Sequence, residues 1–204
     1  MDHKKAISHL KKSDPILGEL FGKHKPSIIN PSKNYFESLA DAIMSQQLSG
    51  KAADTIIKRF KALFPKVRFP SHKQVLSKSD TELRSVGVSG AKASYLKNLA
   101  SAFEDKTLSF KNIDTKTDEE IITMLVKVKG IGRWTAEMFL IFSLGRPDVF
   151  SFGDLGLRNA VKKVYSLRQD PSPKKLTQLS VHWQPYRSTA SLYLWASLNN
   201  RQNS

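Results

Sequence analysis

Two glycines with basic neighbours form the clearest functional pattern in this chain. Gly130-Ile131-Gly132 interrupts an otherwise helical pattern, and a tight turn there directs backbone N–H groups outward at the start of the second helix, where they suit a phosphate. A lone GxG is more typical of an ordinary loop between packed helices. The basic neighbours Lys127, Lys129 and Arg133 favour contact with a nucleic-acid backbone. The pattern therefore predicts a helix, a hairpin and a second helix that together bind a phosphate.

The charge balance points to the same kind of partner. The 204 residues include 33 Lys and Arg against 18 Asp and Glu, a formal net charge of +15. Such an excess favours a polyanionic partner, most often a nucleic acid. Ribosomal proteins and proteins of membrane surfaces are basic as well, so charge alone leaves those classes open.

Composition also limits the chemistry. The chain has no cysteine, which excludes disulfides, thiol catalysis and Cys-ligated zinc or iron–sulfur clusters. Its five histidines are scattered without the pairing of a zinc helix, so we expect no transition metal. No apolar run is long enough to span a membrane and no signal segment is evident. We expect an intracellular protein, in the cytoplasm or nucleoid of a prokaryote or the nucleus of a eukaryote.

Apolar residues recur with helical spacing almost throughout, and no alternating segment demands a strand. The sequence therefore predicts an all-α protein. Helix starts are indicated by cap residues. They are Asp14-Pro15, Ser49, Ser79 with Glu82, Ser89 before a helix to Phe103, Thr117 with Glu120, and Asp154. The segment 88–93 also repeats the hairpin pattern weakly, but a helix cap is the stronger interpretation.

Four ordered blocks resemble one family. They are 128–136 around the hairpin, 148–158 around Asp154, 43–49, and 183–188 continuing to Trp195. Together they resemble the helix-hairpin-helix DNA glycosylase superfamily, and most closely its 3-methyladenine DNA glycosylase II, or alkylbase glycosylase, branch. The resemblance covers most of residues 30 to 200. The chain looks like a compact form that lacks the N-terminal β domain of larger members.

The resemblance implies an architecture. We expect one helix-hairpin-helix glycosylase domain over 1–204, with two helical lobes and an active-site cleft between them. The approximate lobes are a central one, 30–110, and a terminal one, 1–29 with 111–204. We expect the protein to be a monomer.

The resemblance also implies an activity. It is the hydrolysis of the N-glycosidic bond of alkylated purines, the 3-methyladenine and 7-methylguanine class, after base flipping, which leaves an abasic site. Asp154 matches the family's catalytic aspartate, although as a residue alone it is more typical of a helix N-cap, and both roles could hold together. Trp134 and Trp195 match the walls of the base pocket. Because Trp134 stands where lyase members have a lysine, we expect no lyase activity.

The expected partner is double-stranded DNA that contains alkylated bases. Gln47 and Leu48 are the candidate minor-groove wedge, and the other expected DNA-binding residues are Lys129, Gly130, Gly132, Arg133 and Thr135. No cofactor is expected beyond a Na or K ion at the hairpin carbonyls of Val126, Val128 and Ile131 when DNA is bound. Two alternatives stay open, a non-catalytic helix-hairpin-helix DNA-binding module and a glycosylase for other damaged bases.

Overall fold

The computed structural model describes residues 2–26, 29–48 and 50–198. Within these ranges every regular element is a helix and there is no strand, so the predicted all-α class is confirmed. The chain divides into two units, and each is described by itself. Unit 1 comprises residues 1–31 and 140–204, and unit 2 comprises residues 32–139.

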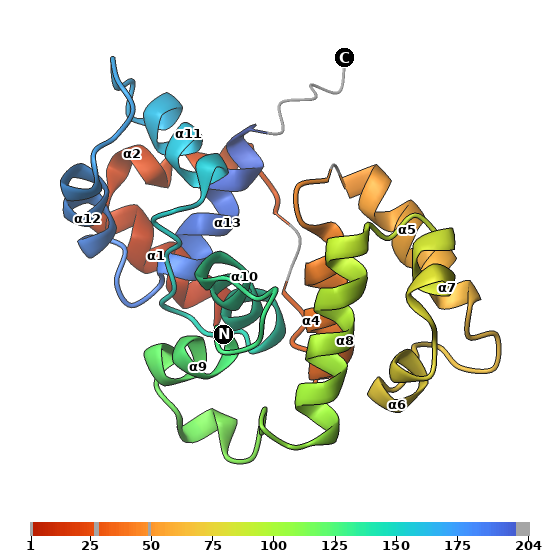
Figure 1. Cartoon of the computed structure of the whole chain (residues 1–204). Helices are drawn as coiled ribbons and strands as arrows, with labels where there is room; N and C mark the ends of the chain where they lie inside the picture. The colour runs from red at the N-terminus through yellow and green to blue at the C-terminus, as the bar shows by residue number, and fades with distance from the viewer. Residues whose placement is uncertain (1, 27–28, 49, 199–204) are drawn as a thin grey trace. The chain divides into compact units, whose positions relative to one another are not determined.

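Unit 1 is built around one buried helix, α13 (Arg187–Leu198), whose residues from Ser188 to Leu194 are all buried. Helices α11 (Leu155–Val164), α1 (His3–Ser13) and α3 (Leu20–Lys23) pack on α13, and α2 (Pro15–Gly18) packs on α1 and α3. Helix α12 (Pro173–Val181) contributes Leu176 to the same core. Trp183, with no exposed surface, is the largest side chain buried there. These elements include both ends of the described chain, drawn in red and blue in Figure 1.

Unit 2 is built on the long helix α8 (Gly90–Glu104). Helices α4 (Tyr35–Ser45), α6 (His72–Leu76) and α7 (Asp80–Ser85) pack on α8, and α5 (Gly50–Ala62) packs on α4 (Figure 1). Helix α9 (Asp118–Leu125) packs on α10 (Arg133–Met138), which in turn contacts α4. A short 3₁₀ turn, η1 (Ile113–Thr115), precedes α9, and a π-helical turn, η2 (Phe139–Ser143), carries the chain from unit 2 back to unit 1.

Local cap chemistry sets most of the helix starts where the sequence predicts them. Ser79 and Thr117 each form a complete capping box with the Glu three residues later, so α7 and α9 begin at residues 80 and 118. Asp14 caps α2, Ser89 caps α8 and Asp154 caps α11. The predicted cap at Ser49 lies outside the described residues.

The boundary between the units differs from the lobes expected from sequence. Residues 111–139, assigned there to the terminal lobe, belong to unit 2. The reason is packing, because α10 contacts α4 and the aromatic rings of Tyr35, Phe110 and Phe139 lie together in the core of unit 2.

Candidate functional site

The hairpin joins α9 to α10 through a turn that requires glycine. Gly130 has φ +107, in the left-handed region. A Cβ added there would lie 2.3 Å from Cγ of Tyr95, so any larger residue would displace that ring. Gly132 is the N-cap of α10. The N–H groups of the first turn of α10 have no carbonyl partner within the helix, which is the arrangement expected for binding a phosphate.

A pocket of about 480 Å³ opens beside this turn. It is lined by the hairpin glycines and by Gln46, Gln47, Tyr95 and Trp134, among others. The Trp134 side chain is 43% exposed, an unusual position for so large an apolar ring. The structure thus places a predicted base-pocket residue and a predicted wedge residue around one cavity of unit 2.

Arg133 makes contacts that the sequence analysis did not foresee. Its guanidinium donates two 2.8 Å hydrogen bonds to the Glu119 carboxylate, and its Nε donates to Glu137 Oε1 at 3.0 Å. The bonds to Glu119 raise the pKa of Arg133 further above its ordinary value and lower that of Glu119. In this state the charge of Arg133 is paired within the protein. Lys129, in contrast, is exposed at the hairpin.

Thr135 is also placed differently from what its expected DNA contact suggests. Its side chain is only 3% exposed, and its Oγ1 accepts a 3.3 Å hydrogen bond from Gln46 Nε2. Since the hydroxyl faces the protein, any contact of Thr135 with DNA would have to use its backbone N–H in the first turn of α10.

The predicted wedge residues follow the end of α4 directly. Gln47 is exposed and has φ +56, a left-handed conformation uncommon outside glycine. Leu48 is next, with 38% of its side chain exposed. Gln46, which the sequence analysis did not select, bonds to the hairpin through its side chain, with Nε2 3.0 Å from the Gly130 carbonyl oxygen. The residue immediately before the two predicted wedge residues is therefore bonded to the hairpin.

The carbonyls of Val126, Val128 and Ile131 were predicted to hold a monovalent cation. Val126 is the C-cap of α9, a position where helix carbonyls lack intrahelical partners. The Val128 oxygen accepts from Ile131 N at 3.0 Å and keeps a second lone pair. Backbone carbonyl oxygens coordinate alkali-metal ions, so these residues fit the predicted group by donor type.

Asp154 lies in unit 1 and is both buried and firmly oriented. The residue is 8% exposed, and Oδ1 accepts from Leu157 N at 2.6 Å as the N-cap of α11. The same oxygen accepts from Trp195 Nε1 at 2.9 Å. The N-cap interpretation is thus confirmed, and Trp195, the other predicted base-pocket residue, holds the carboxylate directly.

Gly156 makes this arrangement possible. A Cβ at this position would lie 3.0 Å from Asp154 Oδ1 and 3.3 Å from both Cδ1 and Nε1 of Trp195. Those distances are shorter than ordinary van der Waals contact, so a side chain would press against both groups. Gly156 lies within the 148–158 block, but its residue type alone predicted no role for it.

An exposed aromatic surface adjoins Trp195. The Phe142 ring, in η2, stacks on the indole with ring centroids 5.7 Å apart and planes 26° apart. Phe142 is 44% exposed, so this pair of rings is open to a planar ligand. Sequence reasoning missed Phe142 because it lies 53 residues from Trp195 and is one of many aromatic residues at helical spacing.

The loop before Asp154 is fixed to the start of α13. The Arg187 guanidinium donates to both oxygens of Asp148, at 2.8 and 3.0 Å. Ser188 Oγ donates to the Arg146 carbonyl at 2.6 Å and accepts from Val149 N at 3.0 Å. Because α13 carries Trp195, these bonds attach both partners of the Asp154–Trp195 pair to one frame.

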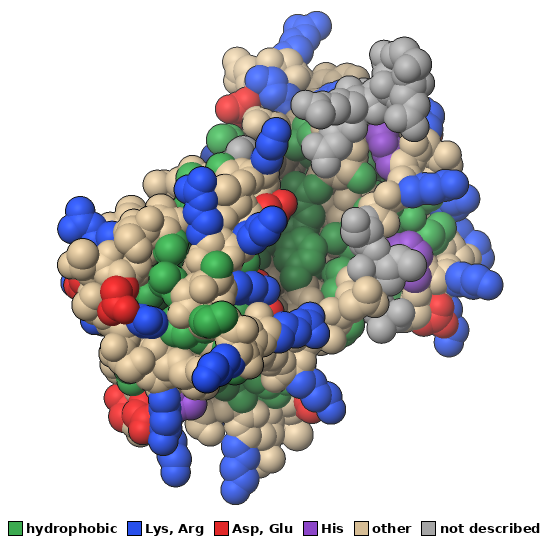
Figure 2. All heavy atoms as spheres, turned by 90° about the vertical axis from the view of Figure 1, so that its right-hand side faces the viewer, with side chains coloured by type: hydrophobic (Ala, Val, Ile, Leu, Met, Phe, Trp, Pro, Cys, Tyr) green, Lys and Arg blue, Asp and Glu red, His purple; other side chains and the backbone are tan. Residues whose placement is uncertain are grey.

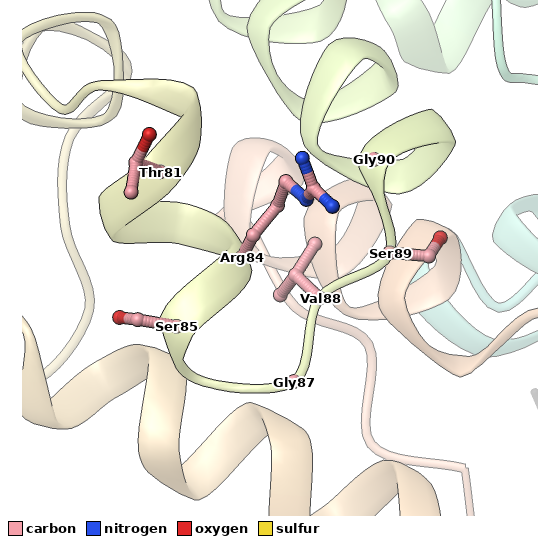
Figure 3. A pocket seen from close by; sticks show the side chains of 7 residues that line it. All are labelled: Thr81, Arg84, Ser85, Gly87, Val88, Ser89 and Gly90. Carbon is pink, nitrogen blue, oxygen red and sulfur yellow. The ribbon is translucent and has the colours of Figure 1, made fainter.

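A second turn in unit 2 lies between α7 and α8. It carries a pocket of about 610 Å³ lined by Arg84, Ser89 and Gly90, among others. Figure 3 shows Arg84 extending from α7 towards the start of α8. Ser89 Oγ accepts from Lys92 N, so the preferred interpretation of this segment as a helix cap is confirmed.

Positive charge is spread over the surface. On the face drawn in Figure 2, blue Lys and Arg side chains project at many separate points, with few acidic groups among them. Among the described residues, no group of three or more His, Asp or Glu side chains could hold a metal ion. No helix in the described part of the chain is long and apolar enough to cross a membrane.

Comparison with known proteins gives consistent matches. Residues 40–185 match the family described as "HhH-GPD superfamily base excision DNA repair protein". DNA-3-methyladenine glycosylase 1 of Schizosaccharomyces pombe is 35% identical over 93% of this chain and 83% of its own length. A putative DNA-3-methyladenine glycosylase of Bacillus subtilis, YfjP, is 31% identical over 94% of this chain and 68% of its own.

Solved structures agree. The Schizosaccharomyces pombe 3-methyladenine DNA glycosylase Mag1, solved in complex with abasic DNA, is similar with a TM-score of 0.83 and 34% identity. The match covers 94% of this chain and 95% of the other. A DNA-3-methyladenine glycosidase from Bacillus halodurans gives a TM-score of 0.82 and 34% identity, over 98% of this chain and 90% of the other.

Proposed function

The chain belongs to the HhH-GPD superfamily of base excision DNA repair proteins, and from this premise we propose that it excises alkylated purines from duplex DNA. The reaction is hydrolysis of the N-glycosidic bond of bases of the 3-methyladenine and 7-methylguanine class, with an abasic site as product. The observation that carries this proposal is the buried Asp154 carboxylate, held between the start of α11 and the indole of Trp195. The names of the similar proteins support the choice of substrate.

The reaction requires one carboxylate that is fixed next to the sugar. Breaking the glycosidic bond develops positive charge on the sugar, which a fixed carboxylate stabilises without having to reorient. Asp154 would also accept a proton from the attacking water. N3- or N7-alkylation makes the base cationic and a better leaving group, so we propose no general acid.

Recognition of a cationic base needs an electron-rich surface. A cation over an aromatic face is attracted by the ring quadrupole, most strongly over tryptophan. The stacked rings of Trp195 and Phe142 offer such a surface next to Asp154. The role of Trp134 in binding the base remains a prediction, which is supported by its 43% exposure.

Binding to DNA would use unit 2. We propose that the backbone amides at Gly130, Gly132 and the first turn of α10 meet a phosphate, with Lys129 beside them and Leu48 entering the minor groove. The carbonyls of Val126, Val128 and Ile131 would hold a Na or K ion, which would supply a positive charge that favours a bound phosphate.

The test is direct analysis of released bases. Methylated genomic DNA is incubated with the protein, and free 3-methyladenine, 7-methylguanine and unmodified purines are separated and quantified. We expect the methylated purines in excess over the unmodified ones. Release of no base at all, with duplex binding retained, would identify a DNA-binding module instead.

The same reaction tests the absence of lyase chemistry. A Schiff base requires an amine, and Trp134 stands at the position where a lysine would supply it. Borohydride added during turnover should trap no protein–DNA adduct, while alkali should still cut the product strand. A trapped adduct that is lost when a lysine is replaced would contradict the monofunctional assignment.

A further inference from the structure

The turn that follows α4 is held from two sides. On one side, Lys92 extends from the first turn of α8, and its Nζ donates to the carbonyl oxygens of Met44 and Gln46, each at 2.8 Å. On the other side, the Gln46 side chain donates to the Gly130 carbonyl and to Thr135 Oγ1, at 3.0 and 3.3 Å. The residue immediately before Gln47 and Leu48 is therefore bonded through both its backbone and its side chain.

A lysine is well suited to the first of these contacts. The last carbonyls of a helix have no intrahelical donors and carry the negative end of the helix dipole. An ammonium group supplies up to three donors and a positive charge at that point. Lys92 is partly buried, and burial lowers the pKa of its ammonium group. Lysine side chains usually keep their charge in water, whereas the ammonium group of the partly buried Lys92 bonds to two backbone carbonyls.

The contact bears on the segment that follows it. Gln47 has φ +56 and Leu48 is 38% exposed, so the protein holds an uncommon backbone conformation next to an exposed apolar side chain. Ordering a residue that is free costs conformational entropy. A segment that is already ordered in the free protein does not lose that entropy when it enters DNA.

We propose that Lys92 is a positioning residue, which holds the Gln47–Leu48 segment in the conformation needed for insertion into the DNA duplex. Base extrusion, and not the chemical step, would then depend on Lys92. The proposal rests on the proposed function, because it assumes that this segment fills the gap left by the flipped base. It concerns Lys92 alone, which no part of the proposed chemistry uses.

The experiment compares two substrates under single-turnover conditions. In one, a 7-methylguanine is paired with cytosine in a duplex, and in the other the same lesion lies opposite an abasic analogue, where it is already unpaired. An unpaired base costs less to extrude. Lys92→Met keeps the length of the side chain but removes its donors. It should slow base release from the paired substrate by on the order of tenfold, which is the effect expected if the backbone of one residue must be ordered during insertion. It should leave the unpaired substrate within about twofold of the wild-type rate.

Matched variants test whether the slower base release of Lys92→Met comes from the turn after α4. Lys97→Met removes a lysine of the same helix that pairs with Asp80 at the surface, and it should leave both rates unchanged. Leu48→Ala should reproduce the substrate selectivity of Lys92→Met. A 2-aminopurine beside the lesion should show a smaller fluorescence rise on binding of Lys92→Met, since less unstacking occurs.

Three results would overturn the proposal. They are an equal loss on both substrates, no loss on either, or an unchanged 2-aminopurine signal. If Lys92→Met does not fold, Lys92→Gln retains one donor group and should show the same selectivity with a smaller loss. Failure of the proposed function is a separate result, because the wild-type protein would then release no base from either substrate.

Discussion

Asp14 and Asp154 are two carboxylates of unit 1 with nearly the same local bonding. Each is the N-cap of a helix, accepting from Leu17 N at 3.0 Å and from Leu157 N at 2.6 Å, respectively. Each also accepts an indole N–H, at 2.8 Å for Asp14 and 2.9 Å for Asp154. Their exposures are 7% and 8%.

The two sites differ in what surrounds the carboxylate. At Asp14 both oxygens are bonded within the core, because Oδ2 accepts from the fully buried Trp183 and from the Tyr165 hydroxyl. At Asp154 the ring that donates to the carboxylate is that of Trp195. Its indole is partly exposed and stacks on the 44% exposed Phe142.

A capped helix with an indole donor is therefore not by itself a sign of catalysis. The same bonds stabilise the core at Asp14 and, we propose, orient a reactive group at Asp154. What separates them is whether the ring that donates to the carboxylate is enclosed or borders on solvent. The same substitution at both positions tests this distinction, because asparagine caps helices about as well as aspartate.

The largest effect is expected for Asp154→Asn. The amide keeps an acceptor for Leu157 N and Trp195 Nε1 but removes the charge that stabilises the sugar. We expect base release to fall on the order of 10²-fold or more, with the melting temperature nearly unchanged. Single-turnover release and thermal denaturation measure the two quantities. A rate near the wild-type value would contradict the catalytic assignment.

Asp14→Asn should show the opposite pattern, a loss of stability without a loss of base release. An amide cannot accept with both of its polar atoms, so one of the buried donors on Oδ2 loses its partner. We expect the free energy of unfolding to fall by about 2–3 kcal/mol, measured by urea denaturation. Base release per folded molecule should stay near the wild-type rate. A loss of rate without a loss of stability would end the distinction between the two carboxylates.

Gly156→Ala tests the crowding around Asp154, with a smaller expected effect. The added methyl group would press against Oδ1 and the Trp195 ring, and a displacement of this kind should slow release by roughly tenfold. Helix propensity acts in the other direction, since alanine in a helix is favoured over glycine by about 0.5–1 kcal/mol. A slower but equally stable or more stable protein is therefore expected.

Gly153→Ala is the matched control for this variant. Gly153 immediately precedes Asp154 in the chain, but a Cβ there would meet no atom within 4 Å. Its rate should equal that of the wild type. If both alanine variants lose the same activity, the effect does not come from contact with Asp154 and Trp195.

Sequence reasoning found the features that depend on near neighbours. The caps at Ser79, Thr117 and Asp154 are set by bonds to residues three positions later, so their patterns are visible in a short segment. The hairpin was found for the same reason, because Gly130 and Gly132 define its turn.

Features that depend on distant residues were not found. The donors to Asp14 Oδ2 lie 151 and 169 residues along the chain. Lys92 and Gln46 contact each other across 46 residues, and nothing in the local pattern of either predicts it. Arg133 shows the reverse case, in which the basic pattern predicted a phosphate contact but could not indicate the pairing with Glu119 across the hairpin.

That pairing has a consequence for how the protein would meet DNA. With the charge of Arg133 compensated by Glu119 and Glu137, the hairpin presents backbone dipoles, which act only at contact, beside the exposed Lys127 and Lys129, while most of the net charge of +15 is carried by lysines and arginines elsewhere. Attraction by dispersed charges reaches about 10 Å and weakens as salt is added, whereas amide hydrogen bonds do not depend on counterion release. Long-range attraction to DNA and the final position on the strand would therefore depend on different parts of the surface. Scattered cations would bring the protein to any duplex, and the hairpin amides with the lysines beside them would fix its register on the phosphates.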